Sequence, residues 1–258
     1  MSILVVHLVP EGLLFAADRN ITTWREGGGL RLIGQAQRPK VLKWPNTDAI
    51  IGYVGQANIS GVMTDEWLYA FIGRNLTFAS FESLADALAN DLNDAMSAGE
   101  IDTPLIIHLG GFENVAGEWT PRIWFVRNTT DLSSAGYTLG GQFDRSEEIA
   151  QPTYFGSKSG NQIRDNVTAL VQKGALFSFR QGYDLAAFNA IDEGQRAAMK
   201  LIVVGHPLSP HQFPASLDEW SKHLRMAVLS YGAYFGAFFA PFEQYVGGGA
   251  DVVTVPWP

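Results

Sequence analysis

The sequence of 258 residues contains no cysteine. This absence excludes disulfide bonds, thiolate-bound zinc and a cysteine nucleophile. It is typical of a reducing compartment, so we expect a cytoplasmic protein. Positive charge is also scarce, because 18 lysines and arginines stand against 26 aspartates and glutamates, for a formal net charge of −8. Nucleic-acid-binding proteins usually carry a basic face, and we therefore expect no nucleic-acid partner.

Long hydrophobic runs are missing as well. The longest uncharged stretch runs from Met226 to Phe242 and is interrupted by Pro241, which is too short for a membrane span. We expect a buried or interface helix there and no membrane partner. The N-terminus has no basic region and no small-residue cleavage site, so it is not expected to be a secretory signal. Hydrophobic residues make up 47% of the chain, enough for a large core, and we expect a single domain over residues 1–258.

Patterns typical of metal and nucleotide sites are absent. The five histidines form neither H-x-x-x-H nor H-E-x-x-H, and no metal site can be assembled from their spacing. His7 and His108 lie in apolar runs, where we expect buried structural histidines. The sequence has no G-x-x-x-x-G-K-[ST], no G-x-G-x-x-G after a strand and no G-x-S-x-G. These gaps argue against the common nucleotide folds and an α/β-hydrolase triad, and we expect no metal and no cofactor.

Periodicity in the apolar residues predicts strands and helices in alternating groups. Runs of strand length occur at Ser2–Val9, Leu13–Ala17, Lys40–Trp44, Ala49–Val54, Leu105–Leu109, Ile123–Arg127 and Ala250–Val255. Helical spacing occurs along Ile59, Met63, Trp67 and Phe71, along Leu84, Leu88, Leu92 and Met96, over Asn161–Lys173, and from Ser216 to about Phe239. Gly27–Gly29 indicates a loop without regular structure. The order indicates an α+β fold in which sheets cover the apolar helix faces.

The N-terminal hairpin offers the first candidate for chemistry. Methionine before a small residue is normally removed, and removal of Met1 would leave Ser2 with a hydroxyl and a free α-amine on one residue. An α-amine has an unperturbed pKa of about 7.7–8.0, so near neutral pH part of it is uncharged and can accept a proton. A nearby cation would lower that pKa, and the cation would itself need an anion to hold it.

Four stretches, in the same order, resemble the proteasome β-subunit family of N-terminal nucleophile (Ntn) hydrolases and its bacterial relatives. They are the hairpin from Ser2 to Asp18, then Arg38–Leu42, Ile51–Ala57 and the glycine-rich Val246–Val253. The likeness covers most of residues 2–112 and about 216–255. It implies a four-layer αββα sandwich of the Ntn-hydrolase type, with two antiparallel sheets between helix layers.

The resemblance implies a role for each matching residue. Ser2 would be the nucleophile and its own amine the general base. Lys40 would lower the pKa of that amine, and Asp18 would pair with Lys40 and fix its position. The backbone N–H of Gly55 would donate to the tetrahedral oxyanion. The second acidic residue of the family falls on or near Glu243.

Two further residues would contact substrate. Thr22 would bind the backbone of an extended peptide by strand addition, and Tyr53 would help to line a restricted first specificity pocket. The sequence also departs from the family. Serine replaces the more usual threonine, the loop between the aspartate and the lysine is longer, Val246 falls near a family serine, and residues 173–214 have no clear counterpart. A further family serine matches either Ser157 or Ser159.

The resemblance implies an N-terminal serine peptidase, a threonine/serine-type endopeptidase, in a homo-oligomeric ring or related assembly. Its substrate would be a peptide or unfolded protein, and an ATPase partner is compatible with the family. Two alternatives stay open. The chain is a catalytically silent structural or interaction subunit if Met1 is retained or Lys40 does not reach Ser2. It is an Ntn amidohydrolase of a small amide if the pocket around Ser2 is closed.

Overall fold

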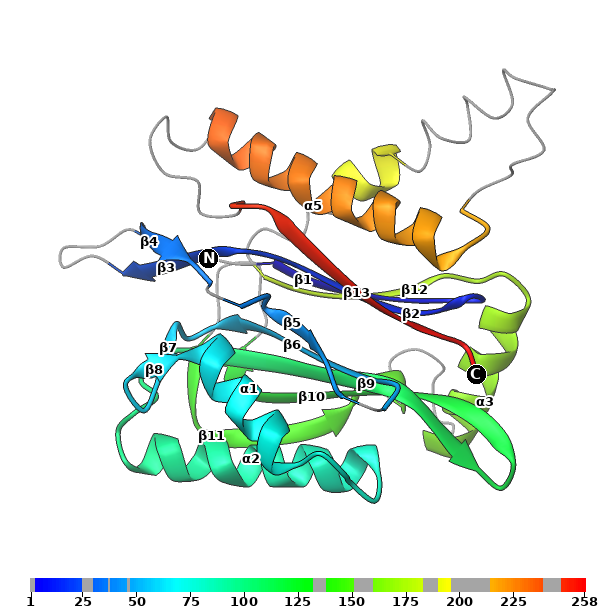
Figure 1. The fold of residues 1–258 in the computed structure, drawn as a ribbon, viewed down its shortest axis with the longest axis horizontal. Coiled ribbons are helices and arrows are strands. Elements are labelled where there is room, and N and C mark those ends of the chain that lie inside the picture. The colour runs from blue at the N-terminus through cyan, green and yellow to red at the C-terminus, as the bar shows by residue number, and fades with distance from the viewer. Residues whose placement is uncertain are drawn as a thin grey trace.

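Two antiparallel sheets form the centre of the computed structural model (Figure 1). The structure describes residues 3–24, 30–36, 38–45, 47–131, 138–150, 160–182, 190–195, 214–238 and 247–258. The first sheet has the order β12-β1-β2-β13, with β12 Phe177–Gly182, β1 Ile3–Val9, β2 Gly12–Asp18 and β13 Ala250–Pro256. The second has the order β11-β10-β9-β6-β5, with β11 Thr138–Glu147, β10 Glu118–Asp131, β9 Leu105–Val115, β6 Ala49–Gly55 and β5 Val41–Lys43.

Helices cover the outer faces of these sheets (Figure 1). Helix α5 (Leu217–Phe238) contacts β2 and β13 of the first sheet, and α2 (Phe81–Ser97) contacts β9, β10 and β11 of the second. Helix α1 (Thr64–Arg74) lies on the same side as α2, and α3 (Gly160–Gln172) contacts β10, β1 and the short η1 (Glu148–Ala150). The expectation of an α+β fold built on antiparallel sheets is confirmed. The described chain also includes a short helical segment at 190–195.

The N-terminal hairpin has apolar residues on both faces because both faces are covered. Leu4, Val6 and Leu8 pack in the core between the two sheets, whereas Ile3 and Val5 pack in the core under α5. All seven residues of β1 are buried. The hairpin turn depends on Gly12, whose φ is +148° and whose position leaves no room for a side chain, since a Cβ would lie 2.2 Å from the Val255 carbonyl oxygen.

Helix α2 begins with a capping box. Ser80 is the N-cap, its side chain accepts from the Ser83 N–H at 3.1 Å, and the Ser83 side chain accepts from the Ser80 N–H at 3.1 Å, which completes a capping box. The predicted apolar stripe is correct, since Leu84, Leu88 and Leu92 are all buried against the second sheet.

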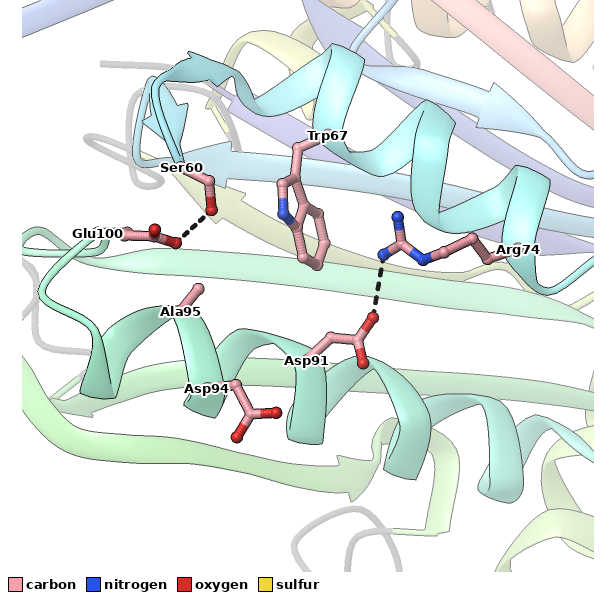
Figure 2. Close-up of a pocket in the computed structure, with 7 residues that line it drawn as sticks. All are labelled: Ser60, Trp67, Arg74, Asp91, Asp94, Ala95 and Glu100. Carbon is pink, nitrogen blue, oxygen red and sulfur yellow. Dashed lines mark hydrogen bonds and ion pairs between the residues drawn. The ribbon is translucent and has the colours of Figure 1, made fainter.

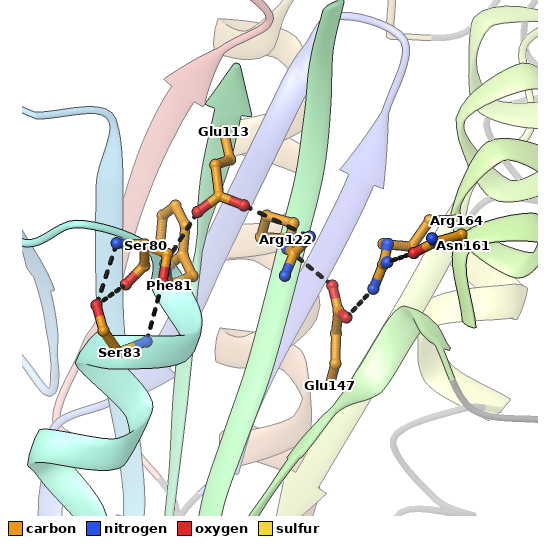
Figure 3. A network of polar contacts seen from close by, with 8 residues as sticks. All are labelled: Ser80, Phe81, Ser83, Glu113, Arg122, Glu147, Asn161 and Arg164. Carbon is orange, nitrogen blue, oxygen red and sulfur yellow. Dashed lines mark hydrogen bonds and ion pairs between the residues drawn. The ribbon is translucent and has the colours of Figure 1, made fainter. Parts of the chain in front are cut away.

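A charged network joins α2, the second sheet and α3 (Figure 3). Glu113 on β9 accepts the Phe81 backbone N–H at 3.1 Å and pairs with Arg122 on β10 at 3.4 Å. Arg122 pairs with Glu147 on β11 at 2.9 Å, and Glu147 also pairs with Arg164 on α3. Burial raises the pKa of Glu147, and the two arginines oppose that rise. The network therefore connects α2 and α3, which are distant in sequence, through three neighbouring strands of the second sheet.

The structure adds one hairpin and corrects one element prediction. The loop predicted at Gly27–Gly29 lies outside the described residues, and β3 (Asn20–Trp24) and β4 (Leu30–Gln35) pair as a hairpin on either side of it. Helix α1 begins at Thr64 rather than near Ile59. The reason is a tight turn at Ser60 and Gly61, with φ of 53° and 77°, which folds β7 (Asn58–Ile59) onto β8 (Val62–Met63).

Helix α5 contains the start of the uncharged stretch from Met226, for which we expect a buried or interface helix. Val228 and Tyr231 are buried, whereas Met226 is 47% exposed and Leu229 is 45% exposed. The helix therefore exposes apolar side chains from Met226 onward, while its first half exposes the charged Asp218, Lys222 and Arg225. Residues 239–246 lie outside the described residues. Within the described part of the chain, no helix combines the length and hydrophobicity that crossing a membrane requires.

Candidate functional site

Asp18 and Lys40 meet at the end of the first sheet as a buried ion pair. The Lys40 Nζ lies 3.3 Å from Asp18 Oδ1, and the two side chains are 1% and 0% exposed. The same oxygen of Asp18 accepts the backbone N–H of Ile3 at 3.0 Å. The other oxygen, Oδ2, accepts the backbone N–H of Gly247 at 3.2 Å. The carboxylate thus holds the lysine, the start of β1 and the turn before β13 together.

Local structure explains why these groups converge. Asp18 is the last residue of β2 and pairs in register with Ala250, the first residue of β13. The turn before Ala250 is glycine-rich, and the Gly247 carbonyl accepts the backbone N–H groups of Arg19 and Asn20 at 2.9 and 3.0 Å. Close packing requires glycine at position 248, where φ is +71° and a Cβ would lie 2.2 Å from the side-chain oxygen of Asn20.

Lys40 reaches this cluster from the second sheet. It stands directly before β5, and its carbonyl accepts the Tyr53 backbone N–H at 3.2 Å. Its Nζ also donates to the backbone carbonyl of Asn20. Burial lowers the pKa of Lys40, and the charge of Asp18 opposes that effect, with smaller contributions from Asp65 and Asp251. The lysine is thus a desolvated cation surrounded by carboxylates, the environment in which an ammonium changes the pKa of a neighbouring amine.

Gly55 and Tyr53 lie at the end of β6, on the strand that pairs with β5. Gly55 has a φ of +110°, and a Cβ there would lie 2.1 Å from the Pro104 carbonyl oxygen, so only glycine fits. It is exposed, in contrast to the preceding residues of the strand. Tyr53 is 2% exposed and packs in the core beneath α1. Burial, Asp65 and Asp18 raise the pKa of its phenol.

The remaining predicted residues are less fully described. Thr22 lies in β3 opposite Leu32 of β4, beside an irregularity in the strand register. Ser2 and Glu243 lie outside the described residues, as do Val246, Ser157 and Ser159. Of the predicted site residues, the structure therefore brings together Asp18 and Lys40, with Gly55 and Tyr53 on the neighbouring strand.

Sequence reasoning missed several groups around this pair. Asp65 is buried at the start of α1, and its Oδ2 accepts the Arg38 backbone N–H at 2.7 Å. Arg19 pairs with Asp251 at 2.6 Å, next to the glycine-rich turn. A correct start for α1 would have placed Asp65 in a first helical turn, where acidic residues are favoured, but would not have shown that Lys40 lies near it.

A pocket elsewhere on the surface does not include this pair (Figure 2). It lies between α1 and α2, where Ser60 donates to Glu100 and Arg74 donates to Asp91 at 3.0 Å. Trp67 projects between these polar groups (Figure 2). Across the described ranges, no cluster of three or more histidine, aspartate or glutamate side chains could hold a metal ion.

Comparisons with known proteins give a match in fold only. No protein-family model matches the chain, and no curated protein matches it. Among solved structures, Anbu (ancestral beta-subunit) from Yersinia bercovieri is 14% identical with a TM-score of 0.50, over 98% of this chain and 81% of that chain. The fold is similar to that of an ancestral beta-subunit. An Anbu (Gly-1) mutant from Hyphomicrobium sp. strain MC1 is also 14% identical, with a TM-score of 0.48, over 99% of this chain and 82% of that chain.

These findings overturn the predicted family. Assignment to the proteasome β-subunit family is wrong as a sequence relationship, because no family model matches and 14% identity to an Anbu structure supports a shared fold alone. The stretches that suggested the family include glycines that the backbone itself requires. At Gly12, Gly55 and Gly248, a Cβ would lie within 2.2 Å of a neighbouring atom. Such glycines follow from the fold and do not identify a family.

Proposed function

We propose that this protein is an N-terminal serine hydrolase that cleaves amide bonds with Ser2 after removal of Met1. One observation carries the proposal. Asp18 Oδ1 accepts both Lys40 Nζ and the N–H of Ile3, the residue that directly follows Ser2 in the chain. A buried cation therefore lies next to the start of β1, where it can act on an α-amine. The arrangement of α5, two sheets, and α1 with α2 supports the αββα layering expected for such an enzyme (Figure 1).

The chemistry uses the two functional groups of Ser2. Its hydroxyl oxygen attacks the amide carbonyl, and its own amine accepts the hydroxyl proton. The Lys40 ammonium lowers the pKa of that amine, so that more of the amine is uncharged near neutral pH. Asp18 keeps Lys40 in place. The amine then gives its proton to the leaving amine, which departs and leaves an ester on Ser2. Water hydrolyses this ester with the amine again as the base.

Gly55 supplies the candidate oxyanion donor. Its strand neighbour Tyr53 pairs with Lys40 through the backbone, and Gly55 is the exposed end of that strand. An N–H donor that meets the developing negative charge in the tetrahedral intermediate typically contributes about 10²–10³ in rate. The φ of +110° at Gly55 fixes the direction of the local backbone.

The substrate is an extended peptide in this proposal. Strand β3 begins at Asn20, whose carbonyl accepts from Lys40, and among the described residues β3 pairs with β4 alone. Its other edge can therefore accept an extended chain by strand addition, with Thr22 two residues from the lysine contact. Glu243 remains the candidate for a second acidic residue of the catalytic site, on the basis of the sequence alone.

Self-association is the second part of the proposal. Met226, Leu229 and Tyr234 on α5 are 47%, 45% and 38% exposed, which gives the helix an exposed apolar face from Met226 onward. We propose that copies of the chain assemble through this face. Native mass spectrometry of the protein and of Leu229→Glu tests the assembly, which the charged variant should weaken. An unchanged oligomer in Leu229→Glu would exclude α5 as the interface.

The activity is tested by intact-mass measurement of the purified protein, with and without an electrophile that requires both a hydroxyl and a free amine on one residue. We expect loss of Met1 and one adduct per chain, and no adduct in Ser2→Ala. Hydrolysis of a panel of fluorogenic peptides should depend on Ser2 in the same way. Retained Met1, or a processed protein that forms no adduct, would favour the catalytically silent subunit. Hydrolysis of small amides without peptides would favour the amidohydrolase.

A further inference from the structure

The carboxylate of Asp65 lies beside the segment that carries Lys40. Asp65 is completely buried, and its Oδ2 accepts the backbone N–H of Arg38 at 2.7 Å. Arg38 precedes Lys40 by two residues, with Pro39 between them. The other oxygen, Oδ1, has no hydrogen-bond partner among the described residues. A buried carboxylate oxygen without a donor is costly unless a positive charge compensates it. Lys40 is a buried cation on which the charge of Asp65 acts, with a smaller effect than that of Asp18.

The same helical turn also contacts the segment that follows Gly55. Thr64 Oγ1 donates to the Gln56 carbonyl at 2.7 Å, and the Thr64 N–H donates to the Ala57 carbonyl at 3.0 Å. Thr64 is completely buried. The first turn of α1 therefore connects the backbone before Lys40 with the backbone after Gly55. In the proposed mechanism Lys40 acts on the Ser2 amine and Gly55 on the substrate oxyanion, and the backbone beside each is held by two adjacent residues, Asp65 and Thr64.

The other charges around Lys40 already have strong partners. Asp251 on β13 is bridged by Arg19 at 2.6 Å. Asp18 accepts from Ile3 and from Gly247 in addition to Lys40. Tyr53, on β6, contributes a phenol whose pKa is raised, so it stays neutral near pH 7. Of the three carboxylates that act on Lys40, Asp65 is the one that forms no ion pair among the described residues, and its Oδ1 has no hydrogen-bond partner among them.

We propose that Asp65 is a positioning residue for Lys40: its carboxylate fixes the backbone before the lysine and places a second buried negative charge beside the segment that carries the ammonium. This inference rests on the proposed function for its catalytic consequence. The electrostatic coupling between Asp65 and Lys40 can be measured without any activity.

The test is an NMR titration of the full-length protein labelled with ¹³C-lysine, in which the Lys40 ¹³Cε signal reports its ionisation. In Asp65→Asn, the midpoint of Lys40 should fall by on the order of one pH unit. Two matched controls break the exposed Arg38–Glu66 ion pair, which measures 2.8 Å, without touching the buried carboxylate. Glu66→Gln and Arg38→Gln should leave the Lys40 midpoint unchanged. An unchanged midpoint in Asp65→Asn overturns the proposal.

A measurement on the wild-type protein covers the case in which Asp65→Asn does not fold. The ¹³Cγ signal of Asp65 should show an inflection at the pH where Lys40 titrates, and its absence would also overturn the proposal.

Kinetics separate this inference from the proposed function. If Ser2→Ala hydrolyses amides as well as the wild type, the proposed function fails, and the titration still decides the role of Asp65. If activity depends on Ser2, the alkaline limb of the kcat/KM profile should move to lower pH in Asp65→Asn, with folding checked by circular dichroism.

Discussion

The Asp18 carboxylate and the Lys40 ammonium lie 3.3 Å apart with side chains that are 0% and 1% exposed. One comes from the end of a strand in the first sheet, and the other comes from the segment before a strand in the second. The pair therefore links the two sheets at the edge where the chain begins. Desolvation of two charges is expensive, so the packing of two sheets does not by itself explain the pair. Its burial supports the catalytic role that we propose for Lys40.

Removal of one partner should destabilise the protein more than removal of both. In Asp18→Asn, the Lys40 ammonium loses its buried counter-charge, and the free energy of unfolding should fall by about 3–5 kcal/mol. The double variant Asp18→Asn with Lys40→Met should recover part of that loss, because no unpaired charge remains. Urea unfolding of the wild type, both single variants and the double variant gives the coupling energy. Additive effects would mean that the two charges do not interact in solution.

Lys40 should be essential for hydrolysis, whereas Lys43, at the end of the strand that follows it, should not. Lys40→Met keeps the length of the side chain and removes the cation that lowers the pKa of the Ser2 amine. The rate should fall by about 10²–10⁴. Lys43→Met is the matched control, since Lys43 is exposed on β5, and it should retain wild-type kcat/KM toward a fluorogenic peptide. Equal activity in the two variants would exclude Lys40 from the mechanism.

Gly55 should tolerate no side chain. A Cβ at Gly55 would lie 2.1 Å from the Pro104 carbonyl oxygen, and the φ of +110° is unfavourable for other residues. Gly55→Ala should therefore lower the free energy of unfolding by roughly 2–4 kcal/mol. Gly61→Ala is the control for backbone conformation alone, because Gly61 has a φ of +77° and nothing lies within 4 Å of its Cβ position. That variant should cost about 1 kcal/mol, as measured by chemical unfolding.

His108 should make the stability depend on pH below 6.5. It is completely buried on β9, and burial, with a smaller contribution from Arg127, lowers the pKa of its ring from 6.5 to about 3. Between pH 6.5 and about pH 3, His108 is protonated in the unfolded chain but not in the folded protein. The contribution of His108 to the free energy of unfolding is therefore highest above pH 6.5 and decreases as the pH falls toward 3. Between pH 7 and pH 5 the loss should be about 2 kcal/mol.

The variant His108→Leu isolates this effect. Both ring nitrogens lack a hydrogen-bond partner among the described residues, so an apolar replacement should leave the stability at pH 7 close to that of the wild type. From pH 7 to pH 5, the difference in free energy of unfolding between variant and wild type should shift by about 2 kcal/mol in favour of the variant. Urea unfolding at the two pH values checks this. Parallel pH profiles would show that His108 does not titrate as described.

Local patterns predicted much of the fold. The hairpin through Asp18, the helix that carries Leu84, Leu88 and Leu92, and the helix predicted over Asn161–Lys173 and found at Gly160–Gln172 all follow from neighbouring residues. Predictions failed where a turn or a distant partner decides the structure. The apolar stripe at Ile59 and Met63 has helical spacing, but the turn at Ser60 interrupts it. Strand β12 was missed because it is stabilised by pairing with β1, far away in the sequence. The prediction of a single domain stays a prediction.

The sequence by itself determined which chemistry was available. Without cysteine or paired histidines, a terminal serine with its own amine was the best remaining nucleophile and base. The resemblance implied that Asp18 pairs with Lys40, but only the tertiary structure decided that this contact is buried, and that Asp65 is buried against the same segment. The physical reason is that a contact between residues from different sheets depends on how the sheets pack, and no local propensity specifies that packing. Burial then sets the strength of the interaction between these charges, since water would screen the same side chains if they were exposed.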